Sequence, residues 1–516
     1  MTLLFALTTA AFAQDDRDLE YRETTVEGTG TTQVSAGFEA QWFEYDNLDL
    51  RALDESSDQN IFDSDDRNSF AFSGAYLNLA HTLDQEQGVT RLVIGASHRG
   101  LWGNDQIGQI NQYGGFVYFT SMYGEFITPN EQLQVRVGRQ YYELGGMGGA
   151  RDYVLADVLD MVRVDWTPND VVRLELTPIT VVGMSSSNDN ANFVSFVGQS
   201  TSQTYGFRGD HMTKRTGGAV VLTPKTNIDV RAYGFYTDVG ALGTGSDISE
   251  NGLLGNFSDN DYVMNAGLRG HMVVNESITP YFSLDMSNGI DRKELVARDV
   301  DTNGTAITVG VRAETGDDDT GFRGEASFFQ ASGAKYGNGS GDSGLQYSHG
   351  YVGMKARQTG GTFADRLMGW HPSAYVGMFG VSDSPHAISR KSGTRVLHAN
   401  AGYDLGKLTV MARWWTFQDM GVTYTDLDQL DSVETPFGYS REEFKAQERM
   451  GEVLGHEADV DLYYSLTDNV QLRANGALFL PGAFYEIPIS RIAGDQLGWD
   501  GEATPWSVSV GTSVRF

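Results

Sequence analysis

The sequence of 516 residues contains no cysteine, which excludes disulfide frameworks, thiolate metal sites and cysteine catalysis. It has no apolar run of the ~18–20 residues that a membrane-spanning helix requires. Basic residues are scarce, since 37 Lys and Arg stand against 68 Asp and Glu for a formal net charge of −31. Phosphate binding needs a basic footprint, so nucleic acid is not expected as a partner. With only 11 prolines and no Pro-rich or Ser-rich linker, the chain favours a single large architecture.

The first residues point to export. Residues 1–13, MTLLFALTTAAFA, form a short apolar run that ends in Ala11-Phe12-Ala13, the small–x–small pattern of a signal-peptidase site. The residues that follow, 14–18, are abruptly polar. We therefore expect a signal peptide over 1–13 and an exported mature chain.

Along most of the chain, apolar and polar residues alternate with a period of two. In the segment 264–272, Met264 and Leu268 share one face with the other apolar residues, and Asn265 and Arg269 share the opposite face. This period is the signature of β-strands with one apolar and one polar face. The same alternation occupies the segments 278–286, 397–405 and 456–464.

The connections between these segments alternate between short and long. The short ones are 129–131, 167–170, 224–227, 275–277, 406–407 and 467–469, and the long polar ones are 46–67, 184–211, 239–260, 288–303, 419–454 and 482–504. Alternating strands with tight turns at one end and long loops at the other are typical of an outer-membrane β-barrel, whose closed sheet leaves no unpaired edge in lipid. A large soluble β-sandwich or β-helix would alternate too, but it does not explain the asymmetry of the connections.

The pattern predicts an all-β protein, a single antiparallel transmembrane β-barrel over 31–516 in the bacterial outer membrane, preceded by a periplasmic segment over 14–30. By pattern the strand count is close to 20, eighteen strands are equally defensible and 16–20 are possible, because the regions 68–101 and 357–382 have mixed faces. Short turns are expected in the periplasm and long loops outside. Aromatic residues near strand ends are expected to form the interfacial girdle: Trp42, Tyr45, Tyr141, Trp166, Tyr236, Trp414, Tyr464 and Trp506.

Two stretches resemble the alginate export family of outer-membrane porins. One is Leu133–Gln140 with its V-G-R-Q sequence, and the other is the closing region, with G-x-E-x-D at 455–459 and L-F-x-P-G-x-x-Y at 478–485. The resemblance implies an 18-stranded monomeric barrel that passes an anionic polysaccharide outward through an arginine-lined constriction. The chain departs from the family at Asn475, where a second arginine would be expected.

Strand parity predicts which charged side chains face the lumen. A guanidinium stays charged at working pH and binds a carboxylate through two hydrogen bonds, so rows of arginine suit an anionic solute. Arg139 falls on the apolar face by parity, and a β-bulge at Gly138 is needed to turn it inward. The predicted substrate pathway consists of Arg136, Arg139, Arg163, Arg173, Arg231, Arg269, Arg312, Arg323, Lys355, Arg357, Arg413 and Arg473.

Ten acidic residues share the inward face, and they allow a second interpretation in which the arginines only brace the wall. These are Asp165, Glu175, Asp229, Asp285, Glu314, Glu325, Asp404, Glu457, Asp459 and Asp461. The main hypothesis is a channel for an anionic polysaccharide or acidic sugar. The alternative is a general or differently specific diffusion porin with paired lumenal charges, and a third, less favoured class is a structural or adhesion barrel with a blocked lumen.

The remaining expectations are simpler. No catalytic motif supports an enzyme, and no cofactor is predicted, although the acidic cluster Asp63, Asp65 and Asp66 could bind Ca²⁺. Outer-membrane lipids and lipopolysaccharide are the expected partners of a monomeric barrel. The segment 441–450 has helix-forming residues within the long connection 419–454, and either this connection or 358–370 could plug the mouth.

Overall fold

The computed structural model describes the barrel wall and some of the segments that join its strands. The described residues are 22–25, 30–46, 68–101, 116–184, 212–239, 261–275, 277–291, 300–316, 320–332, 335–338, 345–348, 351, 353–354, 388–389, 394–419, 423–424, 453, 455–482 and 504–516. The predicted signal peptide, the acidic cluster at 63–66, and the candidate plug segments 358–370 and 441–450 lie outside these ranges and stay predictions.

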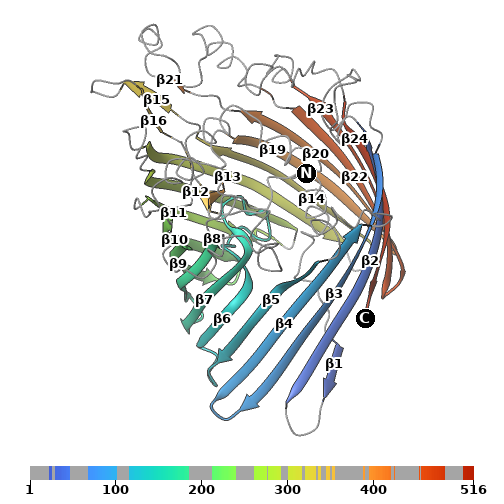
Figure 1. The fold of residues 1–516 in the computed structure, drawn as a ribbon, viewed down its shortest axis with the longest axis horizontal. Helices are drawn as coiled ribbons and strands as arrows, with labels where there is room; N and C mark the ends of the chain where they lie inside the picture. Colours follow the sequence, from blue (N-terminus) through green and yellow to red (C-terminus); the bar gives the residue numbers. More distant parts are fainter. Residues whose placement is uncertain are drawn as a thin grey trace, which may run out of the picture.

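Eighteen long antiparallel strands form one closed sheet (Figure 1). Each pairs with the next along the chain, and β24 pairs with β2, from Gly37 opposite Arg515 to Asp46 opposite Trp506. This confirms the predicted all-β barrel and its 18 strands. The strands are β2 (Thr31–Asp46), β3 (Asn68–Gln85), β4 (Gly88–Leu101), β5 (Phe116–Ile127), β6 (Leu133–Glu143), β7 (Ala156–Asn169), β8 (Val172–Met184), β9 (Met212–Lys225), β10 (Ile228–Val239), β11 (Asp261–Met272), β12 (Ile278–Asp291), β13 (Val300–Gly316), β14 (Thr320–Ala331), β19 (Thr394–Leu405), β20 (Leu408–Asp419), β22 (Gly455–Thr467), β23 (Val470–Pro481) and β24 (Trp506–Arg515).

Six short strands supplement the barrel. β1 (Arg22–Thr25) pairs with the start of β2, and β15 (Lys335–Asn338) forms a hairpin with β16 (Leu345–Ser348). β21 (Thr423–Tyr424) runs parallel to β15, and β17 (Gly353–Met354) pairs with β18 (Ile388–Ser389) in a separate small sheet.

The connections have the predicted asymmetry. Short turns close one end of the barrel, for example Gly406-Lys407 between β19 and β20, and the strand ends that are separated by longer stretches of sequence lie at the opposite end (Figure 1). Local side-chain bonds define several of these turns: the Asn169 Oδ1 atom accepts the N–H groups of Val171 and Val172 at 2.9 and 3.0 Å. Such Asx turns satisfy backbone groups where the ladder stops. The region 68–101, which was ambiguous in sequence, forms β3 and β4.

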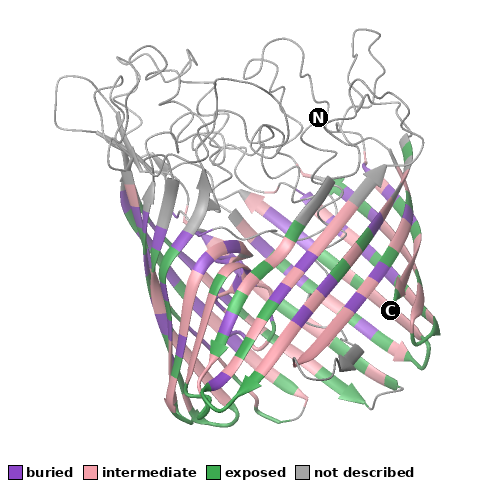
Figure 2. Ribbon diagram, turned by 60° about the horizontal axis from the view of Figure 1, so that its bottom comes forward, coloured by how far each residue is buried: buried purple, intermediate pink, exposed green. Residues whose placement is uncertain are grey.

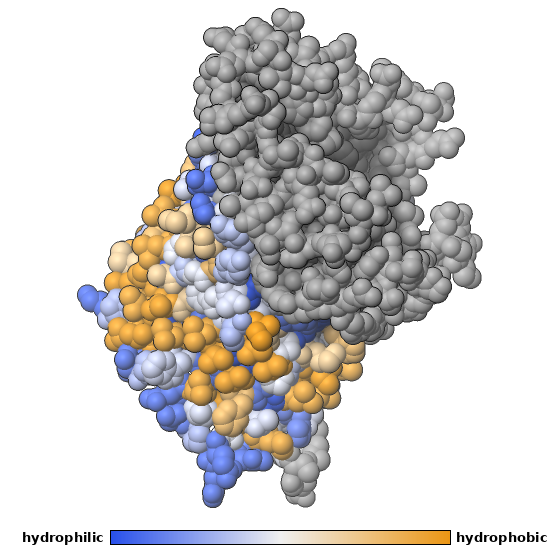
Figure 3. Space-filling model, turned by 60° about the vertical axis from the view of Figure 1, so that its left-hand side comes forward, coloured by the Kyte–Doolittle hydropathy of each residue, from blue (hydrophilic) through white to orange (hydrophobic). Residues whose placement is uncertain are grey.

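The outer wall is apolar. Val137, Ile179 and Met286 are more than half exposed, and Figure 3 shows apolar residues in a broad belt over the wall with hydrophilic residues at the short-turn end. Five of the predicted girdle aromatics are exposed on this surface: Trp42, Trp166, Tyr236, Trp414 and Tyr464. A closed sheet with an apolar exterior satisfies every ladder position while presenting hydrocarbon to lipid. The chain is a β-barrel of the bacterial outer membrane.

No helix within the described ranges has the length and apolar character to cross a membrane.

The inner wall is polar, but the lumen also holds an apolar cluster. Figure 2 shows buried positions alternating along the strands and gathered in a segment that enters the barrel. The cluster joins wall residues such as Leu159, Phe235 and Tyr233 to Leu144 and Val154, which lie between β6 and β7. A folded segment therefore packs inside the barrel and positions the candidate site.

Candidate functional site

Residues 144–155 connect β6 to β7 by folding into the lumen, and we name them the inward loop. Its base is closed by the Leu144 N–H group, which donates to the Leu155 carbonyl at 3.1 Å. At its tip, the Ala150 N–H group donates to the Met147 carbonyl at 3.1 Å, and both residues pack against Tyr281 of β12. The loop narrows the barrel from the wall of β6 and β7 toward β12.

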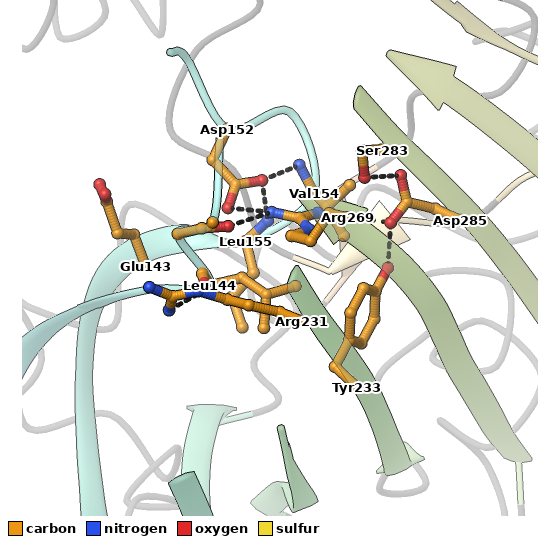
Figure 4. Close-up of polar contacts among 12 residues, drawn as sticks. Glu143, Leu144, Asp152, Val154, Leu155, Arg231, Tyr233, Arg269, Ser283 and Asp285 are labelled. Carbon is orange, nitrogen blue, oxygen red and sulfur yellow. Dashed lines mark hydrogen bonds and ion pairs between the residues drawn. The ribbon is translucent and has the colours of Figure 1, made fainter. Parts of the chain in front are cut away.

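A buried ionic network fastens the inward loop to the wall (Figure 4). Arg269 of β11 is 0% exposed, and it donates to Asp152 Oδ2 of the loop at 2.7 Å and to Asp285 Oδ1 of β12 at 3.3 Å. The second oxygen of Asp152 accepts the N–H groups of Val154 and Leu155 at 2.8 and 3.2 Å. Asp152 therefore holds both the wall and the turn of its own loop.

Further groups complete the network around Asp285. Ser283 donates to its Oδ2 atom at 2.6 Å, and the Tyr233 hydroxyl donates to its Oδ1 atom. Tyr351 lies fully buried beside these charges, and burial together with the negative charge of Asp285 raises the pKa of its phenol well above the ordinary value. The phenol thus stays neutral, and the adjacent Met354 joins the apolar cluster under the inward loop.

Other arginines hold the backbone of the inward loop. Arg231 of β10 donates to the Leu144 carbonyl at 2.9 Å, and Arg312 of β13 donates to the Gly148 carbonyl. A ring nitrogen of His271, Nδ1, lies 3.1 Å from the Gly146 carbonyl oxygen. Backbone carbonyls that would be buried without partners are satisfied in this way.

Aromatic contacts extend the reach of the inward loop across the barrel. Tyr153 stacks on Phe329 of β14 with 4.6 Å between the ring centroids. The guanidinium carbon of Arg151 lies 5.1 Å from the ring centroid of Trp415 on β20. The loop thus leaves β6, contacts strands around a large part of the wall, and returns to β7.

Four glycines give the inward loop its path. Gly145, Gly146, Gly148 and Gly149 all have positive φ, between 60° and 83°, where other residues are strained. A Cβ atom on Gly146 would lie 2.7 Å from the Arg231 Cδ atom. These four glycines therefore allow the positive φ angles of the loop backbone and also leave room for the close approach of the wall arginines.

We expect Gly146→Ala to loosen the inward loop, because the added Cβ strains the backbone by ~1–2 kcal/mol and also contacts Arg231. Gly406→Ala is the matched control, since Gly406 has φ +61° in a short turn and a Cβ there would meet nothing within 4 Å. Both variants should lose a similar amount of thermal stability, because both glycines have positive φ. The single-channel current should be noisier in Gly146→Ala than in Gly406→Ala. Equal current noise in the two variants would contradict a role for the glycine in fixing the loop.

Nine of the predicted pathway residues lie on the lumenal face. They alternate with exposed apolar residues, as Arg269 does with Leu268 and Arg413 with Trp414. Lys355 and Arg357 lie outside the described residues. The nine are Arg136, Arg163, Arg173, Arg231, Arg269, Arg312, Arg323, Arg413 and Arg473.

The prediction for Arg139 is wrong. The register between β5 and β6 runs unbroken through Gly138, with Met122 opposite Arg139 and Tyr123 opposite Gly138, so there is no bulge to rotate the side chain. Arg139 keeps the outward parity of Val137 and forms a two-bond ion pair with Asp160 of β7, at 2.9 and 2.6 Å. The positive φ of Gly138 changes the local backbone without adding a residue.

Every one of the nine lumenal arginines is ion-paired. Two buried carboxylates are shared: Glu125 binds Arg91 and Arg136 at 3.2 and 2.5 Å, and Glu175 contacts three guanidinium groups. The Glu175 partners are Arg173 at 2.6 Å, Arg231 at 3.4 Å and Arg163 at 3.7 Å. The other pairs are Arg163–Asp165, Arg231–Asp229, Arg269–Asp285, Arg312–Glu314, Arg323–Asp404, Arg413–Asp461 and Arg473–Glu39.

The burial within most pairs is unequal. The Arg173 side chain is 38% exposed and Glu175 is 1% exposed, whereas Arg91 is 37% exposed over a Glu125 that is fully buried. The Arg323 side chain is likewise 49% exposed, and that of its partner Asp404 is 19% exposed. In these pairs the carboxylate lies against the wall and the guanidinium group is the more exposed partner. Arg231–Asp229, Arg269–Asp285 and Arg473–Glu39 are about equally buried on both sides, and in Arg312–Glu314 the acid is more exposed.

Several important residues were missed in the sequence. Arg91 lies in the region 68–101, whose faces are mixed, so parity gave no clear assignment, and Glu125 was not among the residues assigned to the lumen. Asp152 and Arg151 belong to the inward loop, which has no periodicity. The Gly-rich run at 145–149 was the available signal, since four glycines in five residues indicate an unusual backbone path. Among the described residues no acidic or histidine cluster suits a metal ion.

No protein-family model matches the sequence, and neither does any curated protein. Solved structures from Pseudomonas aeruginosa share the barrel at low similarity. OccK5 (OpdH) is 11% identical over 94% of this chain and 98% of its own, with a TM-score of 0.43, and OprD is 11% identical over 97% and 99%, with 0.44. OccK2 (OpdF), solved in complex with glucuronate, is 10% identical over 96% and 98%, with 0.45. At this level the likeness says nothing about what this chain binds or transports.

Proposed function

We propose that the chain is an outer-membrane channel selective for small acidic solutes such as sugar acids. The observation that carries the proposal is the unequal burial of four lumenal ion pairs, in which the guanidinium of Arg136, Arg173, Arg323 or Arg413 is more exposed than its carboxylate. A solute in the lumen thus meets donors that remain positively charged at every working pH. Charged lining residues of one sign select ions by their field in a narrow, low-dielectric channel.

The inward loop supports transport of small solutes over a polymer. It narrows the lumen and is fixed by a fully buried ionic network, so the constriction is built into the fold. The anionic polysaccharide that the alginate-export resemblance implies would have to thread past this loop. Export of a polyuronate is therefore the less favoured form of the proposal.

The alternative, a general diffusion porin, is supported by the pairing of all nine predicted pathway arginines that the structure describes on the lumenal face. If pairing cancels their charge, the lumen has no preference for anions. The two functions make opposite predictions for ion selectivity.

We expect single channels in a planar bilayer to be anion-selective under a KCl gradient. Monomeric glucuronate should block the current in a concentration-dependent manner, and neutral glucose should not, because only the carboxylate can pair with the guanidinium groups. Weak or cationic selectivity without block would favour the general porin. Block by polyuronate at far lower concentration than by the monomer would favour the polymer.

A further inference from the structure

Arg151 differs in its partner from the nine predicted pathway arginines on the lumenal face. It projects from the inward loop, and its guanidinium group lies over the Trp415 ring at 5.1 Å. Among the described residues it has neither an ion pair nor a hydrogen bond through its side chain, whereas each of the nine predicted pathway arginines on the lumenal face has a carboxylate. A cation–π contact at a partly exposed site is weak compared with a two-bond pair to a carboxylate.

The surface under Arg151 is rigid. Trp415 is 1% exposed and stacks on His398 with 3.7 Å between centroids, and Phe417 continues the stack. The Trp415 Nε1 and His398 Nε2 atoms are buried and have no hydrogen-bond partner among the described residues. Two ring nitrogens with unused hydrogen-bonding capacity therefore belong to the aromatic stack on which the guanidinium rests.

The backbone that carries Arg151 is equally fixed. Its neighbour Asp152 is bound to Arg269 at 2.7 Å, and Tyr153 stacks on Phe329. The guanidinium thus stands at the end of a flexible side chain on a rigid support, inside the narrowed part of the barrel. Its resting contact with the ring holds it in place without neutralising it.

We propose that Arg151 is the carboxylate-binding residue of the constriction. Its guanidinium group leaves the face of Trp415 and pairs with the acidic group of a passing solute. The inference rests on the proposed function and names the residue that determines specificity. A guanidinium already paired with Asp or Glu must give up that partner to bind a solute, whereas Arg151 gives up only a ring contact within the described part of the chain. The incoming carboxylate accepts two N–H bonds from it.

The test is block of single-channel current by glucuronate in KCl, with glucose as the uncharged probe. Arg151→Gln should weaken glucuronate block about tenfold, and Arg151→Lys should give an intermediate value, because lysine keeps the charge but cannot form the planar two-bond pair. Lys225 is an exposed residue near a short turn, so Lys225→Gln removes the same charge outside the lumen. Glucuronate should block this variant as strongly as it blocks the wild type.

The outcomes separate the two levels of the proposal. Wild-type channels that select anions and are blocked by glucuronate, with Arg151→Gln unchanged from them, would overturn the role of Arg151 and leave the proposed function standing. Wild-type channels without anion selectivity or block would overturn both. Should Arg151→Gln raise the conductance in KCl, the loop has moved, and Arg151→Lys at wild-type conductance then decides: weakened glucuronate block would support the assignment, and block as strong as in the wild type would reject it.

Discussion

Replacing Arg269 with methionine should release the inward loop and raise the single-channel conductance at least twofold. Arg269 is the counter-ion of both Asp152 and Asp285, and all three side chains are buried. Methionine fills a similar volume but leaves two carboxylates without a cation. Removing one partner of a buried ion pair destabilises a protein by about 3–5 kcal/mol, because the other charge is left buried without compensation. Replacing both partners by uncharged residues of similar volume costs far less.

The cheapest relief of that cost is to move Asp152 into water, since it lies on a loop while Asp285 lies on a barrel strand. The loop would then withdraw from the lumen and widen the path. Conductance in KCl measures the widening, and the temperature at which the barrel loses its compact electrophoretic mobility measures the loss of stability. Both should change in Arg269→Met.

A triple variant provides the control. Arg269→Met combined with Asp152→Asn and Asp285→Asn removes all three charges, and the apolar cluster of Leu144, Val154 and Met354 would still hold the loop. We expect its conductance to return toward that of the wild type. A wild-type conductance and melting temperature in the single variant would show that the ionic network does not hold the loop.

The barrel was predictable because its pattern is local. A period of two places Leu268 outside and Arg269 inside with no knowledge of any partner, and nine arginines lie on the face of their strands that this rule gives. Arg139 shows where this rule was wrongly modified: strand parity places it on the outer face, and the bulge assumed at Gly138 to turn it inward does not exist. A bulge requires an extra residue in the register, and the pairing of Gly138 with Tyr123 leaves no room for one.

The inward loop was not predictable because its contacts are distant in sequence. Asp152 and Arg269 are 117 positions apart, and no local sequence pattern at either residue indicates that they form a pair. The same holds for the burial of each carboxylate relative to its arginine: parity shows that Arg173 and Glu175 share a face, but not that Glu175 lies beneath. Ion selectivity depends on that difference in depth.

Glu175→Gln and Arg173→Gln should therefore shift the reversal potential in opposite directions. Glu175 is shared by three guanidinium groups, so its removal leaves Arg163, Arg173 and Arg231 with one fewer compensating charge and raises anion selectivity. Arg173 is the most exposed of the three, and its removal lowers anion selectivity. Glu86→Gln, in the exposed turn between β3 and β4, makes the same chemical change outside the lumen and should shift nothing.

Stability provides the second readout of this pair of variants. Glu175→Gln leaves like charges facing one another in a wall with little water, at a cost of about 1–3 kcal/mol, so the barrel should melt earlier than Arg173→Gln does. The exposed guanidinium of Arg173 can lose its charge at little cost because water already solvates it. Equal and negligible shifts of reversal potential in both variants would mean that the solute path does not run along these residues, and the paired wall would then serve only to brace the barrel.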